Sequence, residues 1–224
     1  MQEVDREDII EVRTGKEVLC CGTDGGSMVT IDCLDISRLS KEQYDALYRQ
    51  ASEERKKRAD RCLRYEDKLR CICAGALLAR AVGETLHLSE FSVVYREEGK
   101  PYLADSLDFH FNLSHSGRWV VLAYGASPLG VDVQEIRPVG NVARRFFTAD
   151  ERDYVSEDPQ RFFRVWTGKE SYLKYLGLGL KKPLDSFSVL EDVGVNLFSR
   201  QLEGAYLTLC TEETEYVLNL LDTL

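Results

Sequence analysis

Two short segments carry the side chains with the clearest capacity for chemistry. The first reads Gly-Val-Asp-Val at 130–133, and the second reads Trp-Thr-Gly-Lys-Glu-Ser-Tyr-Leu-Lys at 166–174. An alternating strand over 129–134 sets Asp132 on the face opposite its apolar residues, on a side cleared by Gly130. A carboxylate so close to a core is costly unless a cation or donors compensate it. Taken alone, this segment favours an edge-strand aspartate in water or one bonded to a turn; a metal ligand is the sharper alternative.

The second segment suits a helix over 162–175. Trp166, Glu170 and Lys174 then share one stripe at i, i+4 and i+8. Taken alone, the stripe favours an amphipathic helix with a surface Glu and Lys pair of little energetic weight. Asp132 and Glu170 together, with Lys169 and Lys174 beside the second, would suit Mg²⁺ and a phosphate ligand, because magnesium commonly takes only one or two protein carboxylates.

Two further segments offer donors for an anion. The loop at 112–118 contains Ser114 and His115, whose hydroxyl and imidazole can bind phosphate. A turn bonded to its own backbone is equally compatible, and a catalytic Ser–His pair is disfavoured because adjacent side chains rarely face each other. Arg55 and Arg58 share one side of a charged helix, which is otherwise a solvated face, and Lys100 lies in a Gly-Lys-Pro turn.

The elements that position these residues alternate between strands and helices. We expect a helix after Ser40 and another over 52–82. Strands are expected near 28–34, 91–96, 109–113, 119–124 and 129–134, the last two as an antiparallel pair joined by Gly-Ala-Ser-Pro. Helices near 140–146, 149–156 and 159–176 precede strands near 185–190, 205–211 and 215–221. This order predicts an α+β fold.

The bulk composition narrows the function classes. The chain has 224 residues, seven cysteines and a formal net charge of −9. That charge argues against general nucleic-acid binding. The cysteines show no C-x-x-C spacing, so we read them as reduced thiols of a cytoplasmic protein. No run of about 18 apolar residues predicts a membrane span. Residues 1–27 are acidic and end in a Gly-rich linker, so we expect an extension of unknown role with the folded unit starting at Met28.

Considered together, these motifs resemble the surfactin-synthetase-activating type of 4'-phosphopantetheinyl transferase. That family is marked by Gly-(Val/Ile)-Asp followed by Trp-x-x-Lys-Glu-x-x-x-Lys, which match 130–132 and 166–174. The segments 111–119, 145–147 and 179–188 are also similar to the family. The resemblance covers roughly residues 28–190, and ordered motifs over that length are far more specific than any one of them.

The resemblance implies an enzyme that moves the 4'-phosphopantetheine arm of coenzyme A to a serine of an apo acyl or peptidyl carrier protein, releasing adenosine 3',5'-bisphosphate. Asp132 and Glu170 would hold Mg²⁺ on the pyrophosphate, and Glu170 is the leading candidate to take the serine proton. Lys174 would stabilise the pyrophosphate, and Trp166 would shape the site. The implied coenzyme A contacts are Arg55, Arg58, Lys100, Ser114, His115, Asp132, Lys169, Glu170 and Lys174. Glu151 matches a further acid near the site whose role stays open.

The resemblance also implies a monomer of two similar α+β lobes with pseudo-twofold symmetry and the coenzyme between them. We expect an N-terminal lobe over 28–126 and a C-terminal lobe over 127–224. Gln134 departs from the pattern, because many relatives carry a third acid there. Arg55 and Arg58 replace lysines, which keeps the charge and favours forked phosphate contacts.

Two alternatives remain at this point. The first is a protein of the same fold that binds coenzyme A or a carrier protein but has lost catalytic activity. Gln134 is the one feature that favours it. A nucleotide-dependent phosphotransferase is disfavoured because the chain lacks a Gly-x-x-x-x-Gly-Lys loop. The sequence leaves open which carrier protein or pathway is served, because carrier choice depends on surface complementarity.

Overall fold

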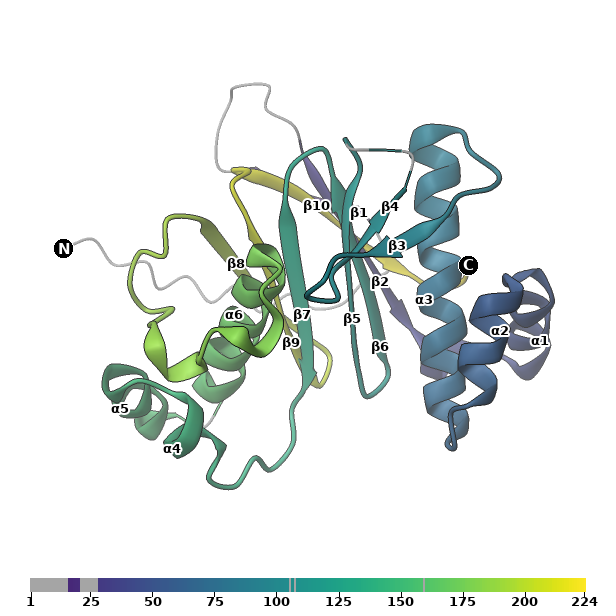
Figure 1. Ribbon diagram of the computed structural model, residues 1–224. Coiled ribbons are helices and arrows are strands. Elements are labelled where there is room, and N and C mark those ends of the chain that lie inside the picture. The colour runs from purple at the N-terminus through teal and green to yellow at the C-terminus, as the bar shows by residue number, and fades with distance from the viewer. Residues whose placement is uncertain (1–15, 21–27, 105, 107, 159) are drawn as a thin grey trace.

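The structure is a computed structural model that describes residues 16–20, 28–104, 106, 108–158 and 160–224 (Figure 1). In chain order its elements are β1 (Lys16–Cys20), β2 (Val29–Asp35), η1 (Ile36–Arg38), α1 (Lys41–Gln50), α2 (Glu53–Asp60), α3 (Tyr65–Leu86), β3 (Val93–Tyr95), β4 (Pro101–Leu103), β5 (His110–Ser116), β6 (Trp119–Gly125), β7 (Leu129–Glu135), α4 (Val142–Phe146), α5 (Ala149–Glu157), α6 (Arg161–Leu176), η2 (Gly179–Lys181), η3 (Leu184–Ser186), β8 (Asn196–Leu202), β9 (Ala205–Thr211) and β10 (Glu215–Leu221).

The strands form two larger sheets and one hairpin. A five-stranded mixed sheet has the order β1-β10-β2-β6-β5, a three-stranded antiparallel sheet has the order β7-β9-β8, and β3 pairs with β4. Figure 1 shows α3 running along the five-stranded sheet on one side of the molecule and α6 lying against β7 and β9 on the other. The expected α+β fold with two lobes is confirmed.

The inner strands β2 and β6 of the five-stranded sheet are buried on both faces, which explains their long apolar runs. Ile31 of β2 and Val121 of β6 pack against the three-stranded sheet, in a cluster that includes Val131 and Leu207. Neighbouring positions on the same strands, such as Leu122, pack instead against the helices α1 to α3. The two lobes therefore share one layer of core between their sheets.

The helix expected over 52–82 is two helices. α2 begins after the N-cap Ser52 and ends at Asp60, and α3 begins at Tyr65. Leu63 between them is 99% exposed. α2 buries only Ala59, whereas α3 buries apolar residues along most of its length. The charged first half of the expected helix thus lies mostly in solvent and its apolar second half in the core. No Gly or Pro in the sequence marks the break between them.

Two strand predictions are wrong, and each error has a structural reason. The expected strand at 185–190 is instead the end of η3 followed by irregular chain. The backbone there bonds to side chains: Lys169 donates to the Phe187 carbonyl, and Glu151 accepts from the Val189 amide. The expected antiparallel pair of 119–124 with 129–134 does not form. Both edges of β6 are taken by β2 and β5, so β7 crosses to the other sheet and pairs with β9.

The chain ends contribute to the fold in ways that the sequence did not indicate. β1 lies within the expected extension of residues 1–27 and pairs antiparallel with β10; the remainder of that extension lies outside the described residues. β10 also pairs in parallel with β2, so the last strand joins the sheet of the N-terminal lobe. It crosses the division that we expect between residues 126 and 127. Within the described ranges, no helix has both the length and the apolar character to cross a membrane.

Candidate active site between the lobes

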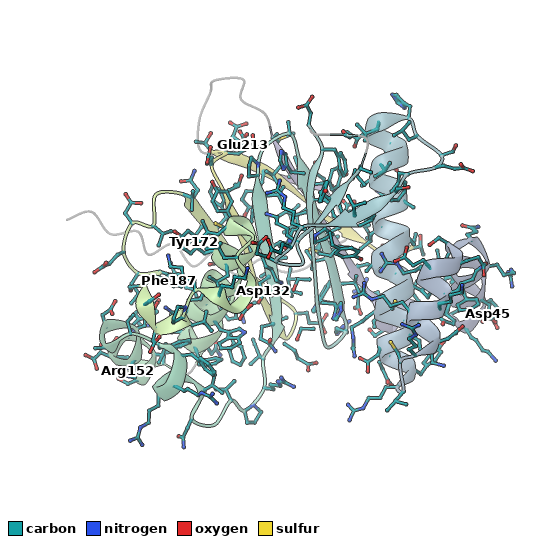
Figure 2. All side chains as sticks on the ribbon, viewed as in Figure 1. Asp45, Asp132, Arg152, Tyr172, Phe187 and Glu213 are labelled. Carbon is teal, nitrogen blue, oxygen red and sulfur yellow. The ribbon has the colours of Figure 1, made fainter. Side chains whose placement is uncertain are left out.

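Asp132 lies in the middle of the molecule, whereas Asp45 and Arg152 lie toward its opposite ends (Figure 2). The side chain is largely buried, and its Oδ1 accepts two hydrogen bonds. Ser114 Oγ donates from β5 at 2.8 Å, and Lys174 Nζ donates from α6 at 2.6 Å. Lys174 also donates to the Val131 carbonyl at 3.0 Å. The two motifs singled out from the sequence therefore meet at one carboxylate.

A row of side chains on β5 holds β7 in place. Asn112, Ser114 and Ser116 alternate along β5 and accept hydrogen bonds from the backbone amides of Val131, Val133 and Glu135 at 3.1, 3.2 and 3.0 Å. These bonds replace the backbone ladder that would otherwise join the two strands. We call this row the seam. Because Ser114 sits within it, the seam fixes the position of Asp132 relative to the N-terminal lobe.

Gly130 lets α6 approach β7 closely. A Cβ atom at this position would lie 2.1 Å from the Ser171 carbonyl oxygen and 2.4 Å from the Tyr175 amide nitrogen. Only glycine fits, since both atoms belong to the helix backbone. The close contact brings the Glu170 and Lys174 stripe over the strand that carries Asp132.

Glu170 lacks a hydrogen bond or ion pair among the described residues and is half-buried. Burial raises the pKa of its carboxyl group, the nearby Asp132 charge raises it further, and Lys174 partly offsets both effects. The charges of Asp132 and Glu170 thus repel each other, and Lys174 offsets part of that repulsion. Such a pair gains from an additional cation.

The oxygen donors present fit a divalent cation of the magnesium type. Mg²⁺ is commonly bound through one or two carboxylates, with water and substrate phosphate completing the octahedron. Within the described part of the chain, no cluster of three or more His, Cys, Asp or Glu side chains could hold a metal on its own. Gln134 follows Asp132 on the same strand face, and its Nε2 donates to Ser116 Oγ at 3.1 Å. The predicted metal ligands therefore remain the two carboxylates, with Gln134 nearby on the same strand face as a neutral amide.

His115 stands next to Ser114 on β5 with part of its surface open to solvent. Partial burial lowers the pKa of its imidazole, and the positive charges of Arg70 and Lys174 lower it further. The His115 imidazole is therefore harder to protonate in the free protein than an isolated imidazole. Three positive or potentially positive groups near one another, Arg70, Lys174 and His115, suit an anionic ligand, whose arrival would favour protonation of the imidazole.

Ser114 and Lys100 have bonds that their predicted role does not include. The hydroxyl of Ser114 gives its one proton to Asp132 and accepts from the Val133 amide. The Lys100 ammonium donates to the carbonyl oxygens of Leu129 and Tyr175. Both side chains are thus engaged with the protein rather than pointing with free donors into an opening.

The expectation that Lys169 anchors the coenzyme is not supported by its position. Its side chain is completely buried and forms an ion pair with Glu151, Nζ to Oε2 at 2.7 Å. The same ammonium donates to the carbonyls of Leu184 and Phe187. All three of its protons are used inside the protein, because the residue next to Glu170 on a helix points to another side. Glu151, whose role was open, is the partner that compensates this buried charge.

The remaining predicted residues lie farther out. Trp166 packs in an aromatic cluster with Phe146 and Phe162, at ring-centroid distances of 6.0 Å each. Arg58 bonds the Tyr95 hydroxyl at 3.4 Å. Arg55 and Arg58 lie on α2, beside α3 at the side of the molecule away from α6 (Figure 1). The structure thus unites Asp132, Glu170, Lys174 and Ser114 but leaves these arginines apart from them.

Sequence reasoning missed the seam. Asn112 and Ser116 were not among the predicted site residues, although each lies two positions from Ser114. Three polar residues alternating on one face of a strand, beside a buried aspartate on another, are the signal that could have indicated a side-chain connection between strands.

Comparison with known proteins gives a consistent family. A family model described as the 4'-phosphopantetheinyl transferase superfamily matches residues 128–221, and one described as 4'-phosphopantetheinyl transferase, N-terminal, matches residues 38–127. The chain is 36% identical over 159 residues to the 4'-phosphopantetheinyl transferase ffp of Bacillus subtilis, covering 67% of this chain and 71% of the relative. It is 35% identical, with the same coverage, to the 4'-phosphopantetheinyl transferase Sfp of Bacillus subtilis strain 168. It is 34% identical over 128 residues to the 4'-phosphopantetheinyl transferase AcpT of Escherichia coli K12, covering 53% of this chain and 65% of the relative.

Proposed function

Because the chain belongs to the 4'-phosphopantetheinyl transferase superfamily, we propose that it transfers the 4'-phosphopantetheine arm of coenzyme A to a serine of an apo acyl or peptidyl carrier protein. The serine oxygen forms a bond to the phosphorus that carries pantetheine, and the bond from that phosphorus to the adenosine-side oxygen breaks. The leaving group is adenosine 3',5'-bisphosphate, and the serine proton passes to a base. The observation that carries this proposal is the meeting of Asp132, Glu170 and Lys174 at one point between the lobes.

Asp132 and Glu170 are the residues that would hold the magnesium ion. When bound, the ion supplies positive charge to the pyrophosphate oxygens, where negative charge develops during transfer. Asp132 retains Oδ2 for this role, because Ser114 and Lys174 both bond its Oδ1.

Glu170 is the proposed proton acceptor. Its pKa is raised by burial and by Asp132, which makes its carboxylate a stronger base than that of an exposed glutamate. Lys174 spends two of its three protons on Asp132 and Val131, and the third is available for a phosphate oxygen. Its charge would stabilise the leaving group.

We assign the outer phosphate contacts of coenzyme A to Arg55, Arg58 and His115. Two observations support this assignment. The guanidinium groups of Arg55 and Arg58 place two positive charges on one face of α2, and the exposed His115 lies within electrostatic range of Lys174. We also propose that the protein is a monomer, which sedimentation would measure, and that it is cytoplasmic, which cell fractionation would measure.

The alternative, a catalytically impaired protein of the same fold, rests on Gln134 alone. None of the relatives named above favours it.

The test is direct transfer. The protein is incubated with coenzyme A, Mg²⁺ and a panel of apo carrier proteins, and the added phosphopantetheine is measured as a mass increase on the carrier. We expect Asp132→Ala and Glu170→Ala each to slow transfer at least about 100-fold while the far-UV circular dichroism stays unchanged. Asp45→Ala, at the far end of the molecule (Figure 2), is the matched carboxylate control and should keep full activity.

Two outcomes would contradict the proposal. Absence of modification on every carrier, despite measurable coenzyme A binding, would leave a binding protein instead of a transferase. Full activity in either site variant would remove that carboxylate from the metal site.

A further inference from the structure

Lys100 connects the two lobes at the rim of the active site. It follows Gly99 in the turn of the β3–β4 hairpin, which the Arg96 and Lys100 backbone groups close at 3.0 Å. Its ammonium reaches out of the hairpin and donates to the Leu129 carbonyl at 3.1 Å and the Tyr175 carbonyl at 2.9 Å. Both acceptors belong to the C-terminal lobe.

The two acceptors lie on the elements that carry the site. Leu129 is the first residue of β7, three positions before Asp132, and Tyr175 follows Lys174 directly near the end of α6. The last carbonyls of a helix lack partners inside the helix, and a cation there is favourable. One ammonium group therefore joins the start of the aspartate strand to the end of the glutamate and lysine helix.

The surroundings leave little freedom at this junction. Gly130, next to Leu129, lies against the Tyr175 amide with no space for a side chain. The Lys100 stem runs past Gly177, where an added Cβ would lie 3.2 Å from Lys100 Cδ. Burial, and then the charge of Arg96, lowers the Lys100 pKa to about 8, which agrees with an ammonium withdrawn from water.

A second contact of the same hairpin with the C-terminal lobe is much weaker. Lys181 Nζ lies 3.4 Å from Glu98 Oε1, and the Lys181 side chain is 62% exposed. Exposed pairs of this kind contribute little. Lys181 therefore provides a matched lysine at the same boundary whose removal should leave the site undisturbed.

We propose that Lys100 is a positioning residue that fixes the start of β7 against the end of α6, and so sets Asp132 relative to Glu170 and Lys174. The effect of Lys100 on catalysis depends on the proposed transferase function. The positioning role replaces the expected role of Lys100 as a coenzyme contact. The contact between its ammonium and the two carbonyls exists in the protein without any ligand, so it can be tested without one.

The experiment compares Lys100→Met, Lys100→Arg and Lys181→Met in the full chain. Methionine keeps the apolar stem and removes the donors, whereas arginine keeps the charge and offers several N–H groups to the two carbonyls. Amide hydrogen exchange is followed in residues 129–133 and 172–178 of the ligand-free protein. Calorimetric titration then measures Mn²⁺ binding without coenzyme and coenzyme A binding without metal.

For Lys100→Met we expect exchange in both segments to accelerate about 10-fold, because two carbonyls of the junction lose a charged donor. Mn²⁺ affinity should fall at least threefold, while metal-free coenzyme A affinity stays within twofold. Lys100→Arg and Lys181→Met should resemble the parent protein in all three measurements. If Lys100→Met does not fold, the same exchange and binding measurements on Lys100→Arg test the proposal.

Two results would overturn the inference. Unchanged exchange in Lys100→Met together with a 10-fold loss of metal-free coenzyme A affinity would make Lys100 a direct ligand. Exchange or metal affinity in Lys100→Arg altered beyond twofold would show that donation to the carbonyls is not the property that matters. Failure of the transferase proposal is a separate outcome, since the exchange measurement requires no reaction.

Discussion

At the scale of single residues, the proposed metal site has a glutamine where the family pattern leads us to expect a third acid. Gln134 follows Asp132 on the same strand face and uses its amide nitrogen to bond Ser116 and the Glu135 carbonyl. Its carbonyl oxygen is left as a neutral donor toward any cation. The proposed metal site consequently has two carboxylates, and one of them, Glu170, is proposed to take a proton as well.

Gln134→Glu should strengthen metal binding by adding a third charged oxygen. We expect the Mg²⁺ concentration for half-maximal transfer to fall about 3-fold to 10-fold. Without metal, the extra charge beside Asp132 should lower the thermal midpoint, and added Mg²⁺ should restore it. The measurement is a magnesium titration of transfer with parallel thermal melts. An unchanged half-saturating concentration would place residue 134 outside the metal site.

Asp32 and Asp35 on β2 give opposite expectations for the dependence of stability on pH. Burial raises the pKa of Asp32, which accepts from Asn219 and lies near Arg80, Glu84 and Tyr124. Burial alone would also raise the pKa of Asp35, but bonds from Arg118 and Ser37 outweigh it and the pKa is lowered.

A raised carboxyl pKa means that the folded state binds the proton more tightly, so stability falls as pH rises from the unfolded pKa through the folded one. Asp32→Asn should therefore stabilise the protein at pH 7 by about 1 kcal/mol, or roughly 2–4 °C, and the gain should shrink as pH falls toward 4. Asp35→Asn should destabilise it at pH 7, since a lowered pKa contributes stability that acid removes. Thermal melts at several pH values measure both. Equal effects of the two substitutions would contradict the assignment.

The residues that sequence reasoning placed correctly are those whose positions follow from local periodicity. Asp132 on the face opposite the apolar strand positions, and Glu170 with Lys174 on one helical stripe, required only the strand and helix repeats. The buried position of Lys169 did not follow from periodicity, because its partners, Glu151 and the carbonyls of Leu184 and Phe187, come from other parts of the chain. The sequence contains no local sign that these segments meet.

At the scale of elements, the contact of β7 with α6 is the arrangement that creates the site. Gly130 is the position where strand and helix backbones touch, and the neighbouring seam bonds hold the other edge of the strand. The expected hairpin of β6 with β7 missed this arrangement. Strand propensity shows that both segments are extended, but it does not show that β5 offers side chains to β7 where a backbone ladder was expected.

Gly130→Ala should destabilise the protein by about 3 kcal/mol or more, because the new methyl group would overlap backbone atoms that cannot move separately. Any protein that still folds should show a displaced α6 and transfer at least about 10-fold slower. Gly125→Ala is the matched control on β6, where an added Cβ would meet its neighbours at 3.5 Å, an ordinary contact. Chemical denaturation measures both variants. Similar losses of stability in the two variants would show that replacing any strand glycine has this effect, and that the contact of Gly130 with α6 is not the cause.

At the scale of the whole molecule, the two lobes depend on each other. β10 comes from the end of the chain yet pairs with β2 near its beginning, and Tyr216 and Leu218 of β10 enter the core between the sheets. That core also contains Ile31 and Val121 from the N-terminal lobe. A division of the chain at residues 126 and 127, natural from the order of motifs, therefore cuts through a shared core and a shared sheet.

Residues 127–224 expressed alone should not form a cooperative unit. β10 would lose both the β2 edge and the apolar residues that cover it, and the inner face of β7 and β9 would be left as an exposed apolar surface. We expect no cooperative thermal transition, strong binding of a hydrophobic dye and loss of Mn²⁺ binding, whereas the full chain should unfold in one transition. Adding a fragment of residues 1–126 should restore the transition if the shared core is what the isolated half lacks. A cooperative melt of residues 127–224 alone would show that the C-terminal lobe folds independently. The seam and Lys100 would then only hold together two lobes that are each already folded.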